Sequence, residues 1–224
     1  MRIVIAGGHG AIGLRLGRAL AARHHTAVGL IRSPEQIEDL RAARVAPIVL
    51  DLEQASLDDA AGVLLGADAV AFCAGAGPGS GVERKDTVDR AAAVLLADAC
   101  EKAGVERYVQ LSSMGVETVR DGATPEGADE VFVAYLRAKL AAEDDLRRRD
   151  LAWTVLRPGR LTDDEGTGRV QLSHSEDRGE VARDDVAAVL AALLEEPGTA
   201  GSVLELVGGD VPVDEAVAAV AAGK

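Results

Sequence analysis

The chain has 224 residues, of which 48% are hydrophobic and only 2% aromatic, and its formal net charge is −13. The acidic charge argues against nucleic acid or an anionic membrane as a partner, which leaves a small-molecule substrate as the expected one. The two cysteines lack zinc-ligand spacing, and neither a signal peptide nor an apolar run of roughly 20 residues is present, so we expect a cytoplasmic protein without a metal site.

Short segments rich in Val and Ile alternate along the chain with longer segments of helical period. The expected strands are 2–6, 26–31, 46–50, 69–74, 107–111, 152–157 and 169–172. The expected helices are 11–23, 34–43, 57–65, 82–103 and 131–149, and a late helix begins within 181–187. Ser33, Ser56 and Asp184 are the expected helix caps, with Ser33-Pro34-Glu35-Gln36 forming a capping box.

Most of these strands show no polar alternation, which is typical of strands buried on both faces of a parallel sheet. The pattern predicts a single domain of residues 1–224: an α/β, doubly wound parallel sheet of the Rossmann type, with a small C-terminal substrate-pocket region. Two irregular stretches, 120–130 and 158–168, follow carboxyl ends of strands. We expect the first to be a mobile loop and both to form walls of a small substrate pocket.

A glycine-rich loop follows the first strand and opens the first helix, and it reads G-x-G-x-x-G from Gly8. Glycine permits a tight turn and a close approach of the backbone to pyrophosphate, while the helix N-terminus offers free N–H groups. This context predicts a dinucleotide site rather than a turn without a ligand. The residues assigned to it are Gly7, Gly8, His9, Gly10, Ala11, Ile12 and Gly13.

The end of the second strand indicates which dinucleotide binds. An acid about 20 residues beyond the loop would bind the ribose of NAD, whereas an arginine accommodates the 2′-phosphate of NADP. The segment contains Arg32 and Ser33 and no acid, so NADP(H) is favoured over NAD(H), unless Arg32 is a solvated arginine at a helix cap. Residues that follow the third and fourth strands are expected near adenine and ribose, respectively: Asp51 and Leu52, and Ala74, Gly75 and Ala76.

Tyr135 and Lys139 lie four positions apart in an expected helix, so their side chains share one face. The strand 107–111 delivers Ser112 and Ser113 to the carboxyl end of the sheet, where the nicotinamide should lie. Phe132 either faces the same cleft or packs in the core. His174 and Arg178 are expected to be exposed loop residues, with contact to an anionic substrate as the alternative.

The chain resembles the atypical, NAD-dependent epimerase/dehydratase-like branch of the short-chain dehydrogenase/reductase superfamily over essentially its whole length. The resemblance rests on the glycine loop, Asp51-Leu52, the segment 111–115, Tyr135 with Lys139, the segment 156–159 and the segment 181–187. It implies a catalytic set of Ser113 (or Ser112), Tyr135 and Lys139, with Lys139 also on the nicotinamide ribose and Pro158 beside the cofactor. By analogy with the family, the protein is a monomer or a homodimer.

The chemistry of this set is consistent with carbonyl reduction. Hydride transfer to a carbonyl carbon leaves charge on oxygen, which needs a proton donor. An ammonium one helical turn away would favour the phenolate form of Tyr135, and a serine would orient the substrate oxygen. We therefore expect an NADP(H)-dependent oxidoreductase that reduces a small carbonyl, quinone or similar acceptor. The alternatives are a non-catalytic NADP(H) redox sensor and an epimerase or dehydratase.

Overall fold

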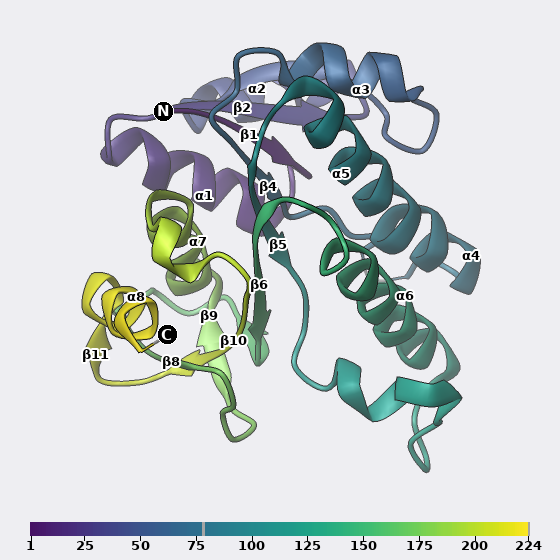
Figure 1. Cartoon of the computed structure of the whole chain (residues 1–224), viewed down its shortest axis with the longest axis vertical. Coiled ribbons are helices and arrows are strands. Elements are labelled where there is room, and N and C mark those ends of the chain that lie inside the picture. Colours follow the sequence, from purple (N-terminus) through teal and green to yellow (C-terminus); the bar gives the residue numbers. More distant parts are fainter. Residues whose placement is uncertain (78, 224) are drawn as a thin grey trace.

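The computed structural model describes residues 1–77 and 79–223, and in these ranges the Val- and Ile-rich segments form a nine-stranded sheet (Figure 1). Such segments are stable in a sheet centre because branched side chains pack well on a pleated surface that is covered on both faces. From one edge to the other the strands are β11 (Val211–Pro212), β8 (Arg169–Ser173), β10 (Ser202–Gly208), β6 (Ala152–Pro158), β5 (Arg107–Leu111), β4 (Ala69–Phe72), β1 (Arg2–Ala6), β2 (Thr26–Ile31) and β3 (Ala46–Val49).

The strands from β10 to β3 pair in parallel, whereas β8 runs antiparallel to β10 and to β11. The order 3-2-1-4-5-6 is that of a doubly wound Rossmann sheet, so the predicted fold class is confirmed. The chain leaves β1 towards β2 and β3 and then returns to β4 on the other side of β1. The carboxyl ends of β1 and β4 therefore form the crevice in which such sheets bind ligands.

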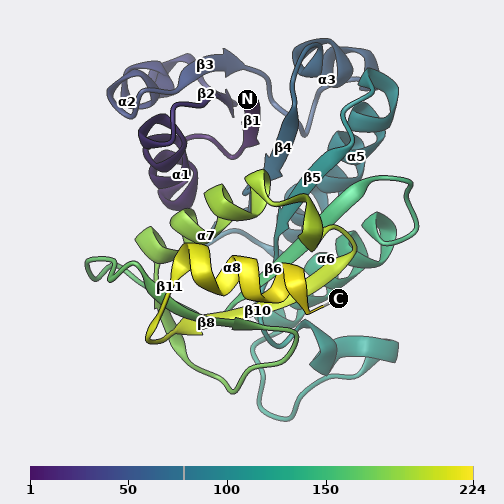
Figure 2. The same ribbon diagram turned by 60° about the vertical axis from the view of Figure 1, so that its left-hand side comes forward.

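Helices cover both faces of the sheet and bury its side chains in two apolar clusters. Figures 1 and 2 show α7 and α8 beside α1 on one side, while α5 and α6 lie on the other. The first face carries α1 (Ala11–Ala22), α2 (Ile37–Ala42), α7 (Arg183–Glu195) and α8 (Val213–Ala222), and the second carries α3 (Leu57–Leu64), α5 (Ala92–Ala103) and α6 (Glu130–Leu146).

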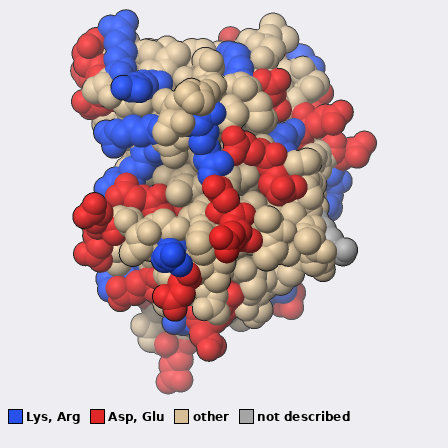
Figure 3. All heavy atoms as spheres, turned by 90° about the vertical axis from the view of Figure 1, so that its left-hand side faces the viewer, with Lys and Arg blue, Asp and Glu red and all other residues tan. Residues whose placement is uncertain are grey.

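The outer side of α1, α7 and α8 is held by surface ion pairs. Arg23 of α1 binds both Glu195 of α7 and Asp214 of α8, and Arg15 binds Asp184 at 2.8 Å. Figure 3 shows acidic and basic side chains interspersed on this face. None of the helices within residues 1–77 and 79–223 combines the length and apolar character that crossing a membrane would require.

Of the three expected helix caps, Ser33 and Ser56 occupy an N-cap position, with Pro34 directly after Ser33 as predicted, and Asp184 does not. Ser56 caps α3 through a reciprocal capping box with Asp59, as predicted. The Ser33 side chain, by contrast, makes no capping hydrogen bond, and the segment begins with a short 3₁₀ turn, η1 (Pro34–Gln36). Asp184 lies inside the first turn of α7, because β9 (Glu180–Ala182) runs directly into that helix and Ala182 occupies the N-cap position.

Further differences concern the segments around the cleft. The stretch 158–168, expected to be irregular, contains β7 (Arg160–Thr162), which pairs in parallel with β9 as a separate two-stranded sheet. The expected helix 82–103 is interrupted: α4 (Val82–Arg84) passes into a π-helix, η2 (Lys85–Ala91), before α5 begins. The start of the expected loop at 120–130 belongs to η3 (Val116–Gly122), a pair of 3₁₀ turns with a kink at Arg120. A last short turn, η4 (Pro197–Thr199), precedes β10.

A buried ionic network fixes α6 to the carboxyl end of β6. The Arg157 guanidinium donates to both carboxylate oxygens of Glu143, with Nη2 2.6 Å from Oε2, and also to Glu117 in η3. Glu143 has no exposed surface and accepts a further hydrogen bond from the Ser112 hydroxyl. Because a buried carboxylate is stable only when it is paired, these contacts set the position of α6, which carries Tyr135 and Lys139.

Removing the charge of Glu143 should therefore destabilise the protein. We expect Glu143→Gln to lower the free energy of unfolding by about 2–3 kcal/mol, because it leaves the buried Arg157 with only part of its compensation. Asp86→Asn, which breaks an exposed i,i+4 pair with Arg90, should cost less than about 0.5 kcal/mol. Urea denaturation of the parent and both variants measures these differences, and equal costs in the two variants would contradict a structural role for the network.

Candidate cofactor and active site

Three connected cavities lie along the carboxyl ends of the strands. The first, of about 310 Å³, extends from the glycine loop to Asp51 and Arg84. The second, of about 500 Å³, shares Gly10, Cys73 and Ala74 with the first and reaches Tyr135. The third, of about 680 Å³, shares Tyr135 and Phe132 with the second. The three cavities thus form one continuous trench, long enough to hold an extended ligand with a reacting partner at its end.

The glycine loop forms the floor where the first two cavities meet. Gly7 has φ +78°, a left-handed conformation that favours glycine, and its carbonyl accepts a hydrogen bond from Gly10 N–H at 2.9 Å. Gly10 is the N-cap residue of α1 and has no side chain to accept a capping hydrogen bond. The first N–H groups of the helix are therefore not capped by a side chain of the N-cap residue. A helix N-terminus in this state is suited to an anion.

Two glycines of the loop serve the packing beneath it instead of lining the trench. A Cβ on Gly13 would lie 2.3 Å from the Gly7 carbonyl oxygen, and one on Gly8 would lie 2.7 Å from Gly29 Cα in β2. Neither residue lines the first or the second cavity. The motif therefore combines one position that faces the ligand, Gly10, with two that let the loop pack against β2 and α1.

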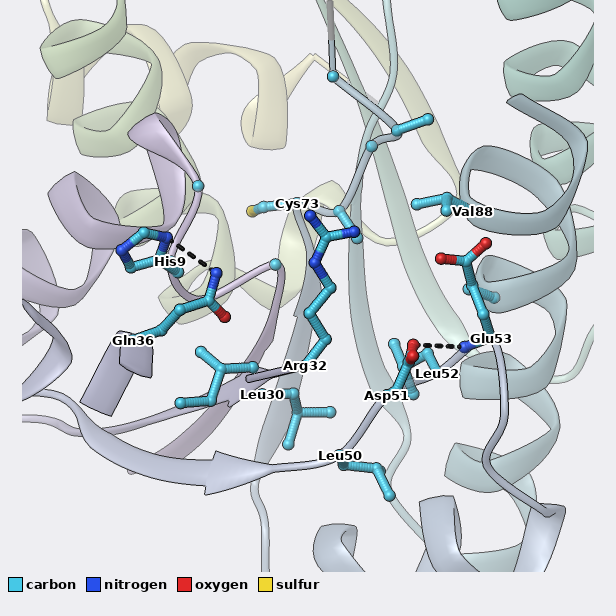
Figure 4. Close-up of a pocket in the computed structure, with 18 of the residues that line it drawn as sticks. His9, Leu30, Arg32, Gln36, Leu50, Asp51, Leu52, Glu53, Cys73 and Val88 are labelled. Atoms are coloured by element: carbon cyan, nitrogen blue, oxygen red, sulfur yellow. Dashed lines mark hydrogen bonds between the residues drawn. The ribbon is translucent and has the colours of Figure 1, made fainter. Parts of the chain in front are cut away.

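Arg32 stands free in the first cavity, and Figure 4 shows its side chain between Gln36 and Glu53. Among the residues that the structure describes, its guanidinium has no hydrogen bond and no ion pair. Glu53 is neutralised by another residue, Arg84, whose Nη2 lies 2.6 Å from its Oε2. Hydrogen bonds from Arg84 and Thr87 hold the pKa of the Glu53 carboxyl below its ordinary value, and the charge of Arg32 adds to this effect. Arg32 thus retains its donors for a ligand.

The other residues assigned to the cofactor are divided between the cavities. Asp51, Leu52 and Ala76 line the first, together with His9, whose Nδ1 is hydrogen-bonded to the Gln36 amide at 3.2 Å. Ala74 and Gly75 line both, and Ala11, Ile12 and Pro158 line the second. Ser33 lines neither cavity. Gln36 in η1, Glu53 in the turn after β3 and Arg84 in α4 were not expected from the sequence, because they carry no motif.

Lys139 is buried behind Tyr135 and is fully occupied by the protein. Its ammonium donates to the carbonyls of Ala74 and Leu111, both at 3.2 Å, and pairs with Asp89 Oδ1 at 3.2 Å. Burial is the largest single influence on the Lys139 ammonium and lowers its pKa, but the neighbouring acidic groups, Asp89 foremost, together raise the pKa above its ordinary value. The Lys139 side chain therefore remains charged at neutral pH.

Tyr135 lies where the second and third cavities meet, with a half-buried ring. Its hydroxyl makes no hydrogen bond to any residue in the described ranges. The Lys139 ammonium lies 5.9 Å from the ring centre, and a second ammonium, that of Lys85, lies 5.6 Å away. Phe132 is 51% exposed and its ring stacks on Tyr135 at 6.0 Å, so it faces the cleft rather than the core. The free phenol is thus bordered by two cations and an aromatic ring.

Lys85 and Asp89 were missed by the sequence analysis because both belong to the π-helix. Asp89 has no exposed surface, accepts a hydrogen bond from Ala76 N–H at 3.1 Å and pairs with Lys139. Lys85 is 8% exposed and donates to the Gly77 carbonyl at 2.9 Å. Their spacing of four is compatible with a shared helical face, but the sequence gives no sign of the π-helix that carries them or of its contact with α6. Such π-turns are frequent at functional sites.

The two serines occupy different environments. Ser112 lines the second cavity, but it is 3% exposed and its hydroxyl donates to Glu143. Ser113 lines the third cavity together with Tyr135, and its hydroxyl donates only to the carbonyl of its neighbour Met114, at 3.1 Å. The geometry therefore leaves Ser113 as the serine whose hydroxyl is able to turn towards a ligand.

Neither covalent catalysis by cysteine nor a metal finds support in this trench. Burial raises the pKa of the Cys73 thiol to about 12, so the side chain is neutral at pH 7 although it lies between the first two cavities. No group of three or more His, Cys, Asp or Glu side chains suited to a metal ion occurs within residues 1–77 and 79–223.

Comparison with known proteins agrees with this architecture. The NAD(P)H-binding family profile matches residues 7–197. A Bacillus subtilis (strain 168) protein named uncharacterized sugar epimerase YhfK is 31% identical over 218 residues, which cover 97% of this chain and 99% of that protein. A solved Bacillus halodurans structure, provisionally named an NAD-dependent epimerase/dehydratase, is 32% identical with a TM-score of 0.88, covering 98% of this chain and 99% of that one.

A second solved structure, the oxidoreductase ylbE from Lactococcus lactis, is 26% identical with a TM-score of 0.85 and covers 98% of this chain and 96% of that one. The similarity extends over nearly the full length of each of these proteins and includes the glycine loop and the sheet beneath it. The chain therefore belongs to the NAD(P)H-binding family of atypical short-chain dehydrogenase/reductase proteins, with a Rossmann-type fold.

Proposed function

We propose that the protein is an NADP(H)-dependent oxidoreductase that reduces a small carbonyl, quinone or similar acceptor. The observation that carries this proposal is the unpaired Tyr135 hydroxyl at the junction of the second and third cavities, next to two ammonium groups. A proton donor at this point stands between the cofactor region and the third cavity, which we assign to the substrate. The name of the Lactococcus lactis relative, an oxidoreductase, is consistent with it.

The trench suits the cofactor in one orientation. The pyrophosphate would lie on the N-terminus of α1 at Gly10, and the adenosine half would extend into the first cavity towards Asp51. Its 2′-phosphate would then meet Arg32, whose planar guanidinium offers paired donors that suit phosphate oxygens. The nicotinamide half would occupy the second cavity, beside Lys139 and Pro158.

The bound dinucleotide would supply the hydride, and this chain would supply the proton. The Tyr135 hydroxyl donates its proton to the oxygen that gains charge as hydride reaches the carbon, and solvent restores that proton afterwards. The ammonium groups of Lys85 and Lys139, which lie 5.6 and 5.9 Å from the ring centre, would attract the negative charge left on the ring after the proton is donated. The Ser113 hydroxyl turns from the Met114 carbonyl to orient the substrate oxygen.

The second candidate is an NADP(H) sensor without turnover, and one observation favours it. The Lys139 ammonium donates two hydrogen bonds to backbone carbonyls and forms an ion pair with Asp89, so the protein already engages it without a ligand. A lysine held in this way is also consistent with a purely structural role. Turnover of NADPH with a panel of quinones and aldehydes separates the two functions: binding of NADPH without turnover of any acceptor would favour the sensor.

The position of the pyrophosphate is tested at Gly10. A Cβ there has one neighbour within 4 Å, the Gly7 carbonyl oxygen at 3.1 Å, so Gly10→Val should fold while filling the place of the phosphates. We expect its affinity for NADPH, measured by calorimetry, to fall by more than about 100-fold, which corresponds to roughly 2.7 kcal/mol. Gly62→Val, in α3, is the control and should bind like the parent. Parent-like affinity in Gly10→Val would exclude the loop from the site.

The choice of cofactor is tested at Arg32. We expect the parent to bind NADPH at least about tenfold more tightly than NADH, a difference of roughly 1.4 kcal/mol. Arg32→Ala should remove most of that difference and leave the affinity for NADH almost unchanged, because only the 2′-phosphate contact is lost. The control is Arg41→Ala, which replaces an exposed arginine of α2 outside the cavity and should keep the difference in affinity between NADPH and NADH. Equal affinities of the parent for the two cofactors would contradict the assignment.

The proton donor is tested by removing one oxygen atom. Tyr135→Phe keeps the ring and its stacking on Phe132, so stability and NADPH affinity should hardly change. Its kcat should fall by about 10² to 10⁴, the usual loss when a positioned general acid is removed. Tyr108→Phe is the matched control, because the Tyr108 hydroxyl binds the Ala93 carbonyl away from the trench. Full activity of Tyr135→Phe would show that the proton comes from another group or from water.

A further inference from the structure

The third cavity has a charge opposite to that of the whole protein. The chain has a formal net charge of −13, yet three arginines and no Asp or Glu line this cavity among the described residues. The remaining lining residues are apolar, small or hydroxyl-bearing, with Phe132, Tyr135 and Leu136 forming an apolar wall from α6. The three arginines are Arg160, Arg178 and Arg183.

All three arginines come from one small structural unit, the two-stranded β7–β9 sheet. Arg160 begins β7, Arg178 precedes β9 by two residues, and Arg183 is the first residue of α7, directly after β9. The backbone of this unit is tightly packed, because a Cβ on Gly159 would lie 2.3 Å from the Gly179 carbonyl oxygen. This unit thus contributes three arginines to the same cavity that the rings on α6 line.

The three arginines differ in how far carboxylates neutralise them. Arg178 forms neither a hydrogen bond nor an ion pair within residues 1–77 and 79–223, and its Nη2 lies 3.7 Å from the Cβ position of Gly115 at the start of η3. Arg183 pairs with Asp163 at 3.0 Å, but the same carboxylate also lies 3.7 Å from Arg15. Arg160 is paired with Glu180 and also lies in the field of Asp164. Arg178 thus has no carboxylate partner in these ranges and Arg183 shares its partner with Arg15, so these two are the arginines least neutralised by the protein.

We infer that the third cavity binds an acceptor with a flat, apolar body and at least two carboxylates, which Arg178 and Arg183 hold while the body lies on Phe132 and Tyr135. Guanidinium groups bind carboxylates through paired, charge-assisted hydrogen bonds, and aromatic rings pack on flat apolar surfaces. The inference names a substrate class for the proposed function. It rests on that function for one point only, the position of the reducible carbonyl at Tyr135. The anion site itself depends on the arginines alone.

The test compares a charged and a neutral probe of the same shape, 5-acetylisophthalate and its diamide, on protein saturated with NADP⁺. Calorimetry on this complex involves no hydride transfer. We expect the parent to bind the dicarboxylate at least about tenfold more tightly than the diamide. Arg178→Gln and Arg183→Gln should each weaken dicarboxylate binding by about fivefold or more and leave diamide binding unchanged. Arg18→Gln, which removes one charge from the exposed side of α1, should change neither affinity.

Each outcome bears on one proposal separately. If the dicarboxylate binds no better than the diamide, or if Arg178→Gln and Arg18→Gln behave alike, the anion site is wrong. Binding of the dicarboxylate that depends on Arg178, together with the absence of NADPH oxidation by any carbonyl, would support the anion site and contradict the proposed reaction. NADPH oxidation by the diamide at the same kcat/KM as by the dicarboxylate would support the reaction and overturn the anion site.

Discussion

The candidate site depends on one buried ammonium group. Lys139 of α6 joins the carbonyl of Ala74 after β4, the carbonyl of Leu111 in β5 and the carboxylate of Asp89 in η2. Four elements that are distant in sequence are thereby held around a single positive charge. Because an unpaired charge at this depth would be costly, each of these elements restricts the position of the others. The place of Tyr135, one helical turn before Lys139, follows from this arrangement.

The parts of the molecule that could be predicted from sequence are those determined locally. The bounds of β1, β2 and β5 agree with the apolar segments, and the glycine loop lies where a strand–loop–helix pattern puts it. Both features depend on only a few consecutive residues. The strands are apolar because both of their faces are buried, and the loop contains glycine because its backbone conformation requires it. The family could be recognised for the same reason.

The parts that could not be predicted depend on contacts between segments far apart in the chain. β7 and β9 are three residues each and are stable only because they pair with one another, so neither has a pattern of its own. Nothing in the sequence distinguishes the Ser112 hydroxyl from that of Ser113 as a ligand contact. In the structure the Ser112 hydroxyl donates to Glu143, which lies 31 residues further along, and is therefore not free to bind a ligand. His174 and Arg178 are exposed, as expected from the sequence, but the place of Arg178 in the third cavity comes from the folding of the β7–β9 unit.

The π-helix η2 has a consequence for how the family varies in length. A π-turn accommodates more residues than an α-turn in nearly the same rise, which is how a helix absorbs a single inserted residue without displacing its neighbours. Lys85 is the first residue of this segment, so the direction of its side chain towards the phenol depends on the π-helical geometry that follows it. A relative with one residue fewer in this segment could keep α4 and α5 in place while changing the side chains that lie between them. The length of the chain in this segment is thus a feature to compare when relatives are examined for a second cation beside the phenol.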